Sequence, residues 1–187
     1  MEFTGQIFID FETFDVWRLY ATALNAAKDR SVRVDVTWDE FLTEDIDPDG
    51  VIPPRIRLLG ACAAVRDAHP ESHQRFVQAL LTLVFQEKDD PKKDSTLAVA
   101  ARVAGIDEDE VIARALEPGL DLLRAWSETA RDRGVTAVPT IISNGPPLYV
   151  QLSGAANYGS SALRLDLINR MLRDDGIWRM SKPPSAS

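Results

Sequence analysis

The stretch that decides the fold is GVTAVPTIISNG, residues 134–145, in the last third of the 187-residue chain. Its centre is rich in β-branched residues, which predicts a β-strand over 137–143. Pro139 stands inside this run, although proline removes a ladder hydrogen bond and is normally confined to edges, strand starts and bulges. A cis peptide bond between Val138 and Pro139 at the strand start would reconcile the two observations, although most X-Pro bonds in folded proteins are trans.

Three further strands are predicted on either side of this one. Residues 148–153 follow after a Gly-Pro-Pro turn, so these two strands are expected to form an antiparallel hairpin. Near the other end of the chain, 5–11 is a short apolar run and 32–38 alternates apolar and polar residues, with a helix over 17–28 between them. Strand, helix and strand predict a βαβ unit with parallel strands. A last amphipathic helix is expected over 159–176.

The segment between the two halves, residues 53–133, repeats apolar residues at helical spacing and is predicted to be all helical. The chain is therefore expected to be a single α/β domain, residues 1–187, with a four-stranded mixed sheet. The core would comprise 5–52 and 134–176, and the helical segment would be an insertion between them. Residues 181–187 are predicted to be a disordered tail.

The order of these elements, the phrase GVTAVPTIISNG and the downstream LSGA (152–155) resemble the DsbA family of thioredoxin-fold proteins. The resemblance is to its cytosolic branch of FrnE-like proteins and 2-hydroxychromene-2-carboxylate isomerases, and it covers residues 7–172. It implies a thioredoxin-like fold in which Pro139 is the family's cis-proline. It also implies that the chain backbone there can pair with a bound peptide or thiol cofactor, so Val138, Pro139 and Thr140 are expected to bind ligand.

The resemblance further implies where the reactive cysteines of the family would stand. The family carries Cys-x-x-Cys in the first turn of the helix after the first strand, where the helix dipole lowers the thiol pKa. The matching positions are taken to be Trp17, Arg18, Leu19 and Tyr20, with the helix starting at Trp17. Neither cysteine nor the serine of the isomerase branch is present, so thiol-disulfide exchange by the usual route is excluded. Trp17 and Tyr20 either contact a ligand or fill the vacated space, and a narrow apolar pocket is expected between Trp17 or Arg18 and Pro139.

Charge and cysteine content exclude several other classes of function. The formal net charge of -8 argues against binding to nucleic acid or to an anionic membrane surface. Cys62 is the only cysteine, so no intrachain disulfide can form, and its apolar helical surroundings predict a core residue. The chain shows no signal peptide and no apolar stretch long enough to span a bilayer, so a cytoplasmic location is expected.

Two motifs are typical of metal sites, and neither is complete. The sequence DIDPDG (45–50) begins like a calcium-binding EF-hand loop, but the twelfth position is Ile56 instead of glutamate. His69 and His73 have the i, i+4 spacing of helical metal ligands. Pro70 lies between them, so they are predicted to be exposed residues at a helix boundary. No metal is predicted.

Three hypotheses for function follow. The first is a DsbA-like protein that lacks the redox centre and binds a peptide or a small thiol-bearing or aromatic ligand. The second is an isomerase- or transferase-like enzyme that uses a low-molecular-weight thiol such as glutathione or mycothiol, oriented by Arg18 and Tyr20; no other cofactor is predicted. The third is a homodimeric interaction subunit whose sheet edge or helical insertion forms the interface. Whether the chain is an enzyme stays open at this point.

Overall fold

The computed structural model describes the chain in several stretches, namely residues 2–44, 46, 50–143, 147–150, 161, 164–166 and 168–169. The predictions for the LSGA motif and for the tail over 181–187 lie outside these residues. Most of DIDPDG and most of the helix expected over 159–176 lie outside them as well.

The structure contains the predicted four-stranded mixed sheet, in the order β2-β1-β3-β4. The strands are β1 (Glu2–Ile9), β2 (Arg33–Glu40), β3 (Thr140–Ile142) and β4 (Leu148–Tyr149). The first two are parallel, and the helix α1 (Phe14–Ala26) connects them. The hairpin of β3 and β4 is antiparallel, and β3 also pairs antiparallel with β1. The βαβ unit and the hairpin are therefore both as predicted.

The strand that the sequence predicts over 137–143 is shorter in the structure. It begins at Thr140, directly after Pro139, which has no N–H to contribute to a ladder. The Val138–Pro139 bond is cis in the structure. The strand predicted over 148–153 is described only as far as Val150.

The predicted start of the first helix at Trp17 is wrong, because α1 begins at Phe14. A turn directly after β1 accounts for the earlier start. One oxygen of the Asp10 carboxylate accepts hydrogen bonds from the backbone N–H groups of Glu12, at 3.1 Å, and Thr13, at 2.7 Å. Thr13 is the N-cap residue, so residues 17–20 belong to the body of the helix and not to its first turn.

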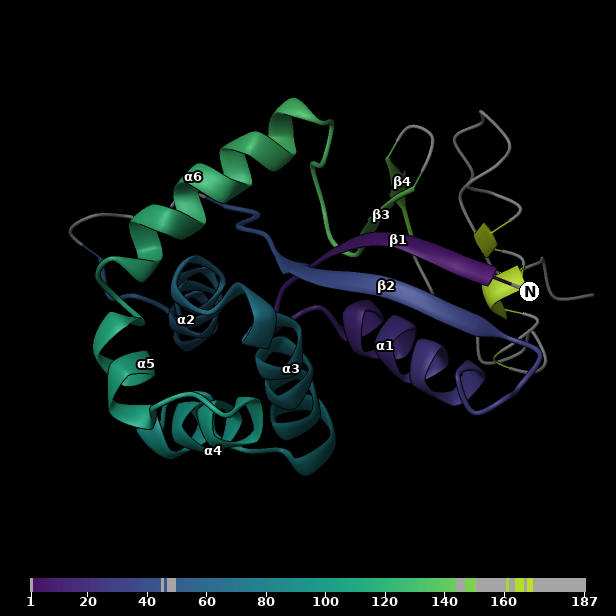
Figure 1. Cartoon of the computed structure of the whole chain (residues 1–187). Coiled ribbons are helices and arrows are strands. Elements are labelled where there is room, and N and C mark those ends of the chain that lie inside the picture. The colour runs from purple at the N-terminus through teal and green to yellow at the C-terminus, as the bar shows by residue number, and fades with distance from the viewer. Residues whose placement is uncertain are drawn as a thin grey trace, which may run out of the picture.

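The predicted helical insertion lies between β2 and β3. It consists of α2 (Pro54–Ala68), α3 (Pro70–Leu81), the π-helix η1 (Thr82–Glu87), α4 (Asp94–Ala104), α5 (Glu108–Arg114) and α6 (Gly119–Asp132). Figure 1 shows these helices gathered beyond the ends of β1 and β2, while α1 lies along the sheet. Within the described residues, no helix combines the length and apolar character of a membrane span. The cytoplasmic location stays a prediction.

Two glycines let α2 pack closely against the segment that runs from the end of α5 to the start of α6. A side-chain carbon at Gly60 would overlap the carbonyl oxygen of Ala115, and one at Gly119 would overlap the carbonyl oxygen of Gly60. Both overlaps involve backbone atoms, which cannot move aside as a flexible side chain can. The contact of α2 with this segment therefore requires glycine at both positions.

We expect Gly60→Ala to destabilise the protein, although alanine is the better helix former by about 1 kcal/mol. Overpacking of this kind costs about 1–3 kcal/mol, so the packing effect should exceed the gain in helix propensity. Urea denaturation followed by circular dichroism measures the free energy of unfolding. Thr129→Ala, on the exposed side of α6, is the control and should change stability little. A more stable Gly60→Ala protein would contradict this account of the helix contact.

Candidate functional site

Two polar side chains, Asp10 and Thr13, lie in the turn between β1 and α1, at one end of the sheet. The Thr13 hydroxyl donates to the second oxygen of the Asp10 carboxylate at 2.8 Å, in addition to the two backbone donors of that carboxylate. Phe8 pairs with Thr140, and the same register continued by one residue places Pro139 beside Ile9. The turn that carries Asp10 and Thr13 and the cis-proline therefore lie at the same end of the sheet. Sequence reasoning missed both polar residues, although Thr13 before a helical run is a typical N-cap signal.

Trp17 and Tyr20 pack toward the helical insertion. The Trp17 ring stacks on Phe85 of η1, with ring centroids 6.0 Å apart, and also contacts Tyr20 at 5.8 Å. Tyr20 is 3% exposed, and its ring is nearly perpendicular to the Trp38 ring, with centroids 5.2 Å apart. None of these ring partners belongs to the cis-proline loop. Trp17 and Tyr20 thus lie beyond the first turn of α1 and pack against neighbouring aromatic rings, and their assignment to the family's Cys-x-x-Cys positions stays a prediction.

The remaining residues predicted for the site have mainly packing contacts. Leu19 is fully buried in the core. Arg18 lies over the Phe14 ring at 4.7 Å and pairs with Asp15 at 3.2 Å. Val138 and Thr140 are buried. A ligand contact at Val138, Pro139 or Thr140, and a pocket between Trp17 or Arg18 and Pro139, stay predictions.

A hollow of about 410 Å³ lies on the insertion side of Tyr20. It is formed by α1, α3, η1 and α4 and is lined by Tyr20, Arg75, Gln78, Ala79, Thr82, Leu83, Glu87, Val99 and Val103. The Tyr20 and Thr82 hydroxyls both donate to the Gln78 carbonyl oxygen, at 3.3 and 3.0 Å. The change from α-helix to π-helix occurs at Thr82, and such changes are frequent at functional sites. The sequence carries no signal for this hollow beyond Tyr20 itself.

The environment of Tyr20 keeps its hydroxyl protonated. Burial raises the pKa of Tyr20 above its ordinary value of 10.0, and a hydrogen bond with Thr82 opposes this in part. The neutral phenol can therefore both donate and accept a hydrogen bond at the wall of the hollow.

We expect Tyr20→Phe to reduce the loss of stability in strongly alkaline solution. The unfolded tyrosine ionises near pH 10.0, whereas the folded one ionises at higher pH. The stabilisation is complete below the unfolded pKa and is lost as the pH rises through the folded pKa. Phenylalanine does not ionise, so the variant should show a shallower fall in the free energy of unfolding in this window. Chemical denaturation at a series of pH values tests this, and equal slopes for the two proteins would contradict it.

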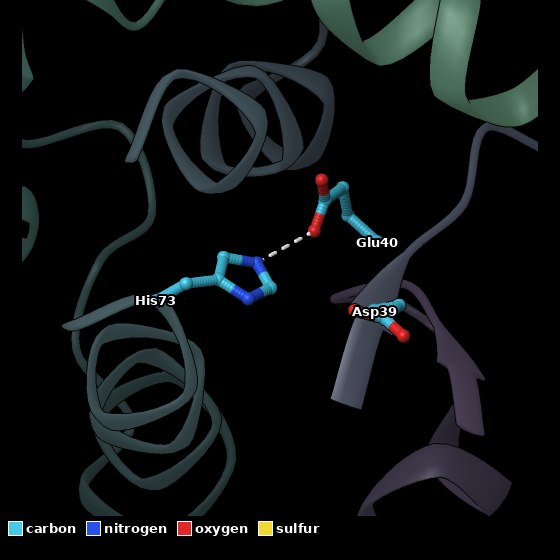
Figure 2. Close-up of side chains that lie close together, drawn as sticks. All are labelled: Asp39, Glu40 and His73. Carbon is cyan, nitrogen blue, oxygen red and sulfur yellow. Dashed lines mark hydrogen bonds and ion pairs between the residues drawn. The ribbon is translucent and has the colours of Figure 1, made fainter. Parts of the chain in front are cut away.

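A second polar cluster is buried at the end of β2 and is shown in Figure 2. Asp39, Glu40 and His73 are 5%, 1% and 4% exposed, and His73 Nε2 lies 3.0 Å from Glu40 Oε2. The prediction that His73 is exposed is therefore wrong. The first turn of α3 points toward β2, which the sequence alone does not indicate. His69, between α2 and α3, is partly exposed beside Glu110, in agreement with its predicted place at a helix boundary.

The three side chains could in principle hold a metal ion, because one ligand atom from each lies within 4.8 Å of the others. Two observations show that they do not fit one. The Arg66 guanidinium already pairs with Asp39 and, at 3.0 Å, with Glu40. The second observation is that Gln74 fixes which nitrogen of the His73 ring carries the proton.

Gln74 determines which nitrogen of His73 carries a proton. Its side-chain amide forms hydrogen bonds with both backbone groups of Trp38. The Trp38 N–H donates to Oε1 at 2.8 Å, and Nε2 donates to the Trp38 carbonyl oxygen at 3.1 Å. The same Nε2 lies 3.1 Å from His73 Nδ1, which must therefore accept. The proton of a neutral imidazole then sits on Nε2 and is donated to Glu40. A metal ion bound at Nε2 would displace this proton to Nδ1. There the N–H would face the Gln74 amide nitrogen, which is itself a donor.

The cluster thus joins the insertion to the sheet. Arg66 comes from α2, His73 and Gln74 come from α3, and their partners are the last residues of β2. Glu40 Oε1 is buried and has no hydrogen-bond partner among the described residues. Burial raises the pKa of the Cys62 thiol, and the charge of Glu40 raises it further. Cys62 is a fully buried core residue, as predicted, and is not suited to act as a nucleophile.

We expect Arg66→Met to destabilise the protein by about 3–5 kcal/mol, because it leaves buried carboxylates without their cation. Arg124→Met is a matched control, since Arg124 pairs with Asp121 at 2.7 Å on the exposed surface of α6. Exposed pairs contribute about 0–1 kcal/mol. Adding Glu40→Gln to Arg66→Met should recover part of the loss by removing one uncompensated charge. Equal effects of Arg66→Met and Arg124→Met on the free energy of unfolding would contradict this role.

Comparisons with known proteins agree on the fold. No protein-family model and no curated protein matches the sequence. Among solved structures, 2-hydroxychromene-2-carboxylate isomerase matches 91% of this chain and 95% of its own, with a TM-score of 0.62 and 12% identity. A putative protein disulfide isomerase from Nitrosomonas europaea matches 94% of this chain and 100% of its own, with a TM-score of 0.58 and 15% identity.

A third structure, the cytosolic disulfide reductase DsbM from Pseudomonas aeruginosa with GSH, matches 90% of this chain and 98% of its own. Its TM-score is 0.56 and its identity is 11%. Such identities support a shared fold and carry no statement about activity. The predicted fold class is therefore confirmed: this chain has a DsbA-like thioredoxin fold, with an all-helical insertion and a single cysteine outside the helix start.

Proposed function

We propose that this protein binds a small ligand without redox chemistry, in the hollow beside Tyr20. The observation that carries the proposal is the hollow itself, at about 410 Å³. Ligand sites of proteins have volumes of about 300–1,000 Å³, and they combine apolar walls with a few polar groups. The hollow has both, because Tyr20 and Thr82 present hydroxyls beside the apolar side chains of Leu83 and Val99.

The absence of redox chemistry follows from the cysteine content. Thiol-disulfide exchange needs an attacking thiolate and a second sulfur to resolve the mixed disulfide. Cys62 is the single cysteine of the chain, and burial raises the pKa of its thiol. The neighbours in fold include proteins named as a disulfide isomerase and a disulfide reductase, but the chemistry of those names requires groups that this chain lacks.

The lining of the hollow indicates the chemistry of the ligand. Its apolar wall favours an aromatic or aliphatic body. Arg75 at the rim uses one guanidinium nitrogen to bind the Val103 carbonyl, at 3.1 Å, and a guanidinium has five N–H donors in all. Glu87 adds a negative charge to the same lining. We infer that an apolar molecule with an acidic group would bind with that group near Arg75 and away from Glu87.

The test uses anilinonaphthalene sulfonate, a fluorescent aromatic anion, as a probe for this chemistry. Titration with the purified protein should show saturable binding. Arg75→Ala should weaken it by about two- to fivefold, and Glu87→Gln should strengthen it by a similar factor, as expected for exposed charges. Ala79→Trp should abolish binding by filling the hollow. Opposite signs for the two charge variants are difficult to explain by binding elsewhere.

The control for Ala79→Trp is Thr129→Trp, which adds the same ring on the exposed side of α6. It should leave probe binding unchanged. The proposal fails if the probe binds Ala79→Trp as well as it binds the natural sequence. A competition assay with candidate metabolites then identifies ligands that displace the probe.

A second candidate function is binding of a small thiol at the start of α1. The position of the Thr13 hydroxyl favours it, because it lies at the N-cap of a helix whose dipole attracts a thiolate. The structure of DsbM with GSH, a neighbour in fold, contains such a thiol. Against it, the Asp10 carboxylate already provides a negative charge at this helix start and accepts the Thr13 hydroxyl.

One thermal melting experiment distinguishes the two candidate functions. Glutathione or mycothiol, added at high excess, should raise the melting temperature only if a thiol site exists, since a ligand at 100 times its dissociation constant stabilises by about 2.7 kcal/mol. Thr13→Val should remove that shift and leave probe binding at the Tyr20 hollow intact. No shift with either thiol favours the first proposal.

A further inference from the structure

The outer edge of β2 has backbone groups that no described residue pairs with. β2 is the first strand in the sheet order, so only one of its sides pairs with β1. The N–H of Phe41 donates to Ile9 of β1, whereas both backbone groups of Trp38 bond the Gln74 amide on the other side. By the alternation of a strand, the backbone groups of Val34 and Val36 also point outward. Within the described part of the chain, no hydrogen bond uses them.

Gln74 therefore closes one end of this edge, and none of the residues that the structure describes pairs with the rest. Its side-chain amide forms the same pair of hydrogen bonds with the Trp38 backbone that a peptide group of a neighbouring strand would form. Open strand edges are templates for pairing with another chain. The available length, about three to five residues, suits a short antiparallel pairing.

We propose that a second copy of this chain pairs its own β2 against this edge, antiparallel, about a two-fold axis at Val34. In this register Val34 faces Val34 of the second copy, and Arg33 faces Asp35 of the second copy on both sides of the axis. Within one copy, Arg33 pairs with Asp35 at 3.2 Å, with both side chains mostly exposed. Opposite charges directly across two strands stabilise the pairing, and like charges oppose it.

The alternative registers are less favourable. A shift that places Val34 opposite Val36 also places Asp35 opposite Asp35 of the second copy, which brings like charges together. A further shift to Val36 opposite Val36 places Val34 opposite Trp38, whose backbone groups are already bound by Gln74. The sequence of alternating charges on β2 therefore selects one register for a symmetric pair.

An apolar hollow beside the edge supports the same partner. It measures about 140 Å³, and its lining includes Leu24 of α1 and Val34, Val36 and Trp38 of β2. Leu24 is 41% exposed there, which is high for a large apolar side chain. Directly paired residues of antiparallel strands point to the same face of the sheet, so the two copies would bring their α1 helices to one face. Each copy's Leu24 would then lie near the hollow of the other, as in an interface that uses the same patch twice.

Analytical ultracentrifugation of charge-reversal variants tests the proposal. The natural sequence should sediment as a dimer at high micromolar concentration. Arg33→Asp and Asp35→Arg each place like charges opposite one another and should raise the dissociation constant about tenfold or more. An equimolar mixture of the two variants should dimerise again, because each then supplies the charges that the other lacks. The double variant, carrying both changes in one chain, should also recover dimers.

Val34→Pro is a second test that leaves the charges in place. It removes an outward N–H without touching the ladder to β1, so the chain should fold and stay monomeric. Circular dichroism verifies the fold of each variant. A natural sequence that stays monomeric, or charge variants that dimerise as well as the natural sequence, would overturn the proposal. A mixture that does not recover dimers would overturn the register. Probe binding at the other side of Tyr20 is measured separately, so neither result depends on the other.

Discussion

The compensation of two buried carboxylates is the constraint on which the rest of the structure depends. Asp39 and Glu40 end β2 inside the molecule, where an isolated charge is costly. Arg66 from α2 pairs with both, and His73 from α3 donates to Glu40. Because each partner comes from a different helix of the insertion, satisfying these carboxylates places the helices relative to the sheet. Burial of a charge pair is a weak source of stability by itself, but its geometry is specific.

The placement of α3 has consequences along the whole length of that helix. His73 binds Glu40, its neighbour Gln74 binds the backbone of Trp38, and Gln78, one turn further, accepts the Tyr20 hydroxyl. Residues four apart share a helix face, so Gln74 and Gln78 lie along the same side of α3. That side covers one end of the β2 edge and forms part of the wall of both hollows beside Tyr20. One helix orientation thus shapes the proposed ligand site and limits the open strand edge.

The start of α1 shows how the fold can persist without thiol chemistry. A helix N-terminus attracts negative charge, which in an enzyme can lower the pKa of a thiol. Here the Asp10 carboxylate lies at that position and binds the backbone of Glu12 and Thr13. The turn after β1 is therefore stabilised by a carboxylate that belongs to the chain itself. This interaction also accounts for the early start of α1.

The local patterns of the sequence determined the elements and their order. Periods of 2.0 or 3.6 residues reveal the βαβ unit and the helical insertion, and a short loop between two strands reveals the hairpin. The cis bond before Pro139 was expected from a proline inside a strand-like run and from the resemblance to the DsbA family, and not from any period. The predicted start of the first helix was wrong by three residues, because the apolar pattern does not record the turn that the Asp10 side chain stabilises. Tertiary structure alone decided that His73 is buried, that Arg66 meets Asp39 and Glu40, and that Tyr20 borders a hollow. Those contacts join residues 26 to 58 positions apart, and no local period records which partner a buried charge or hydroxyl will find.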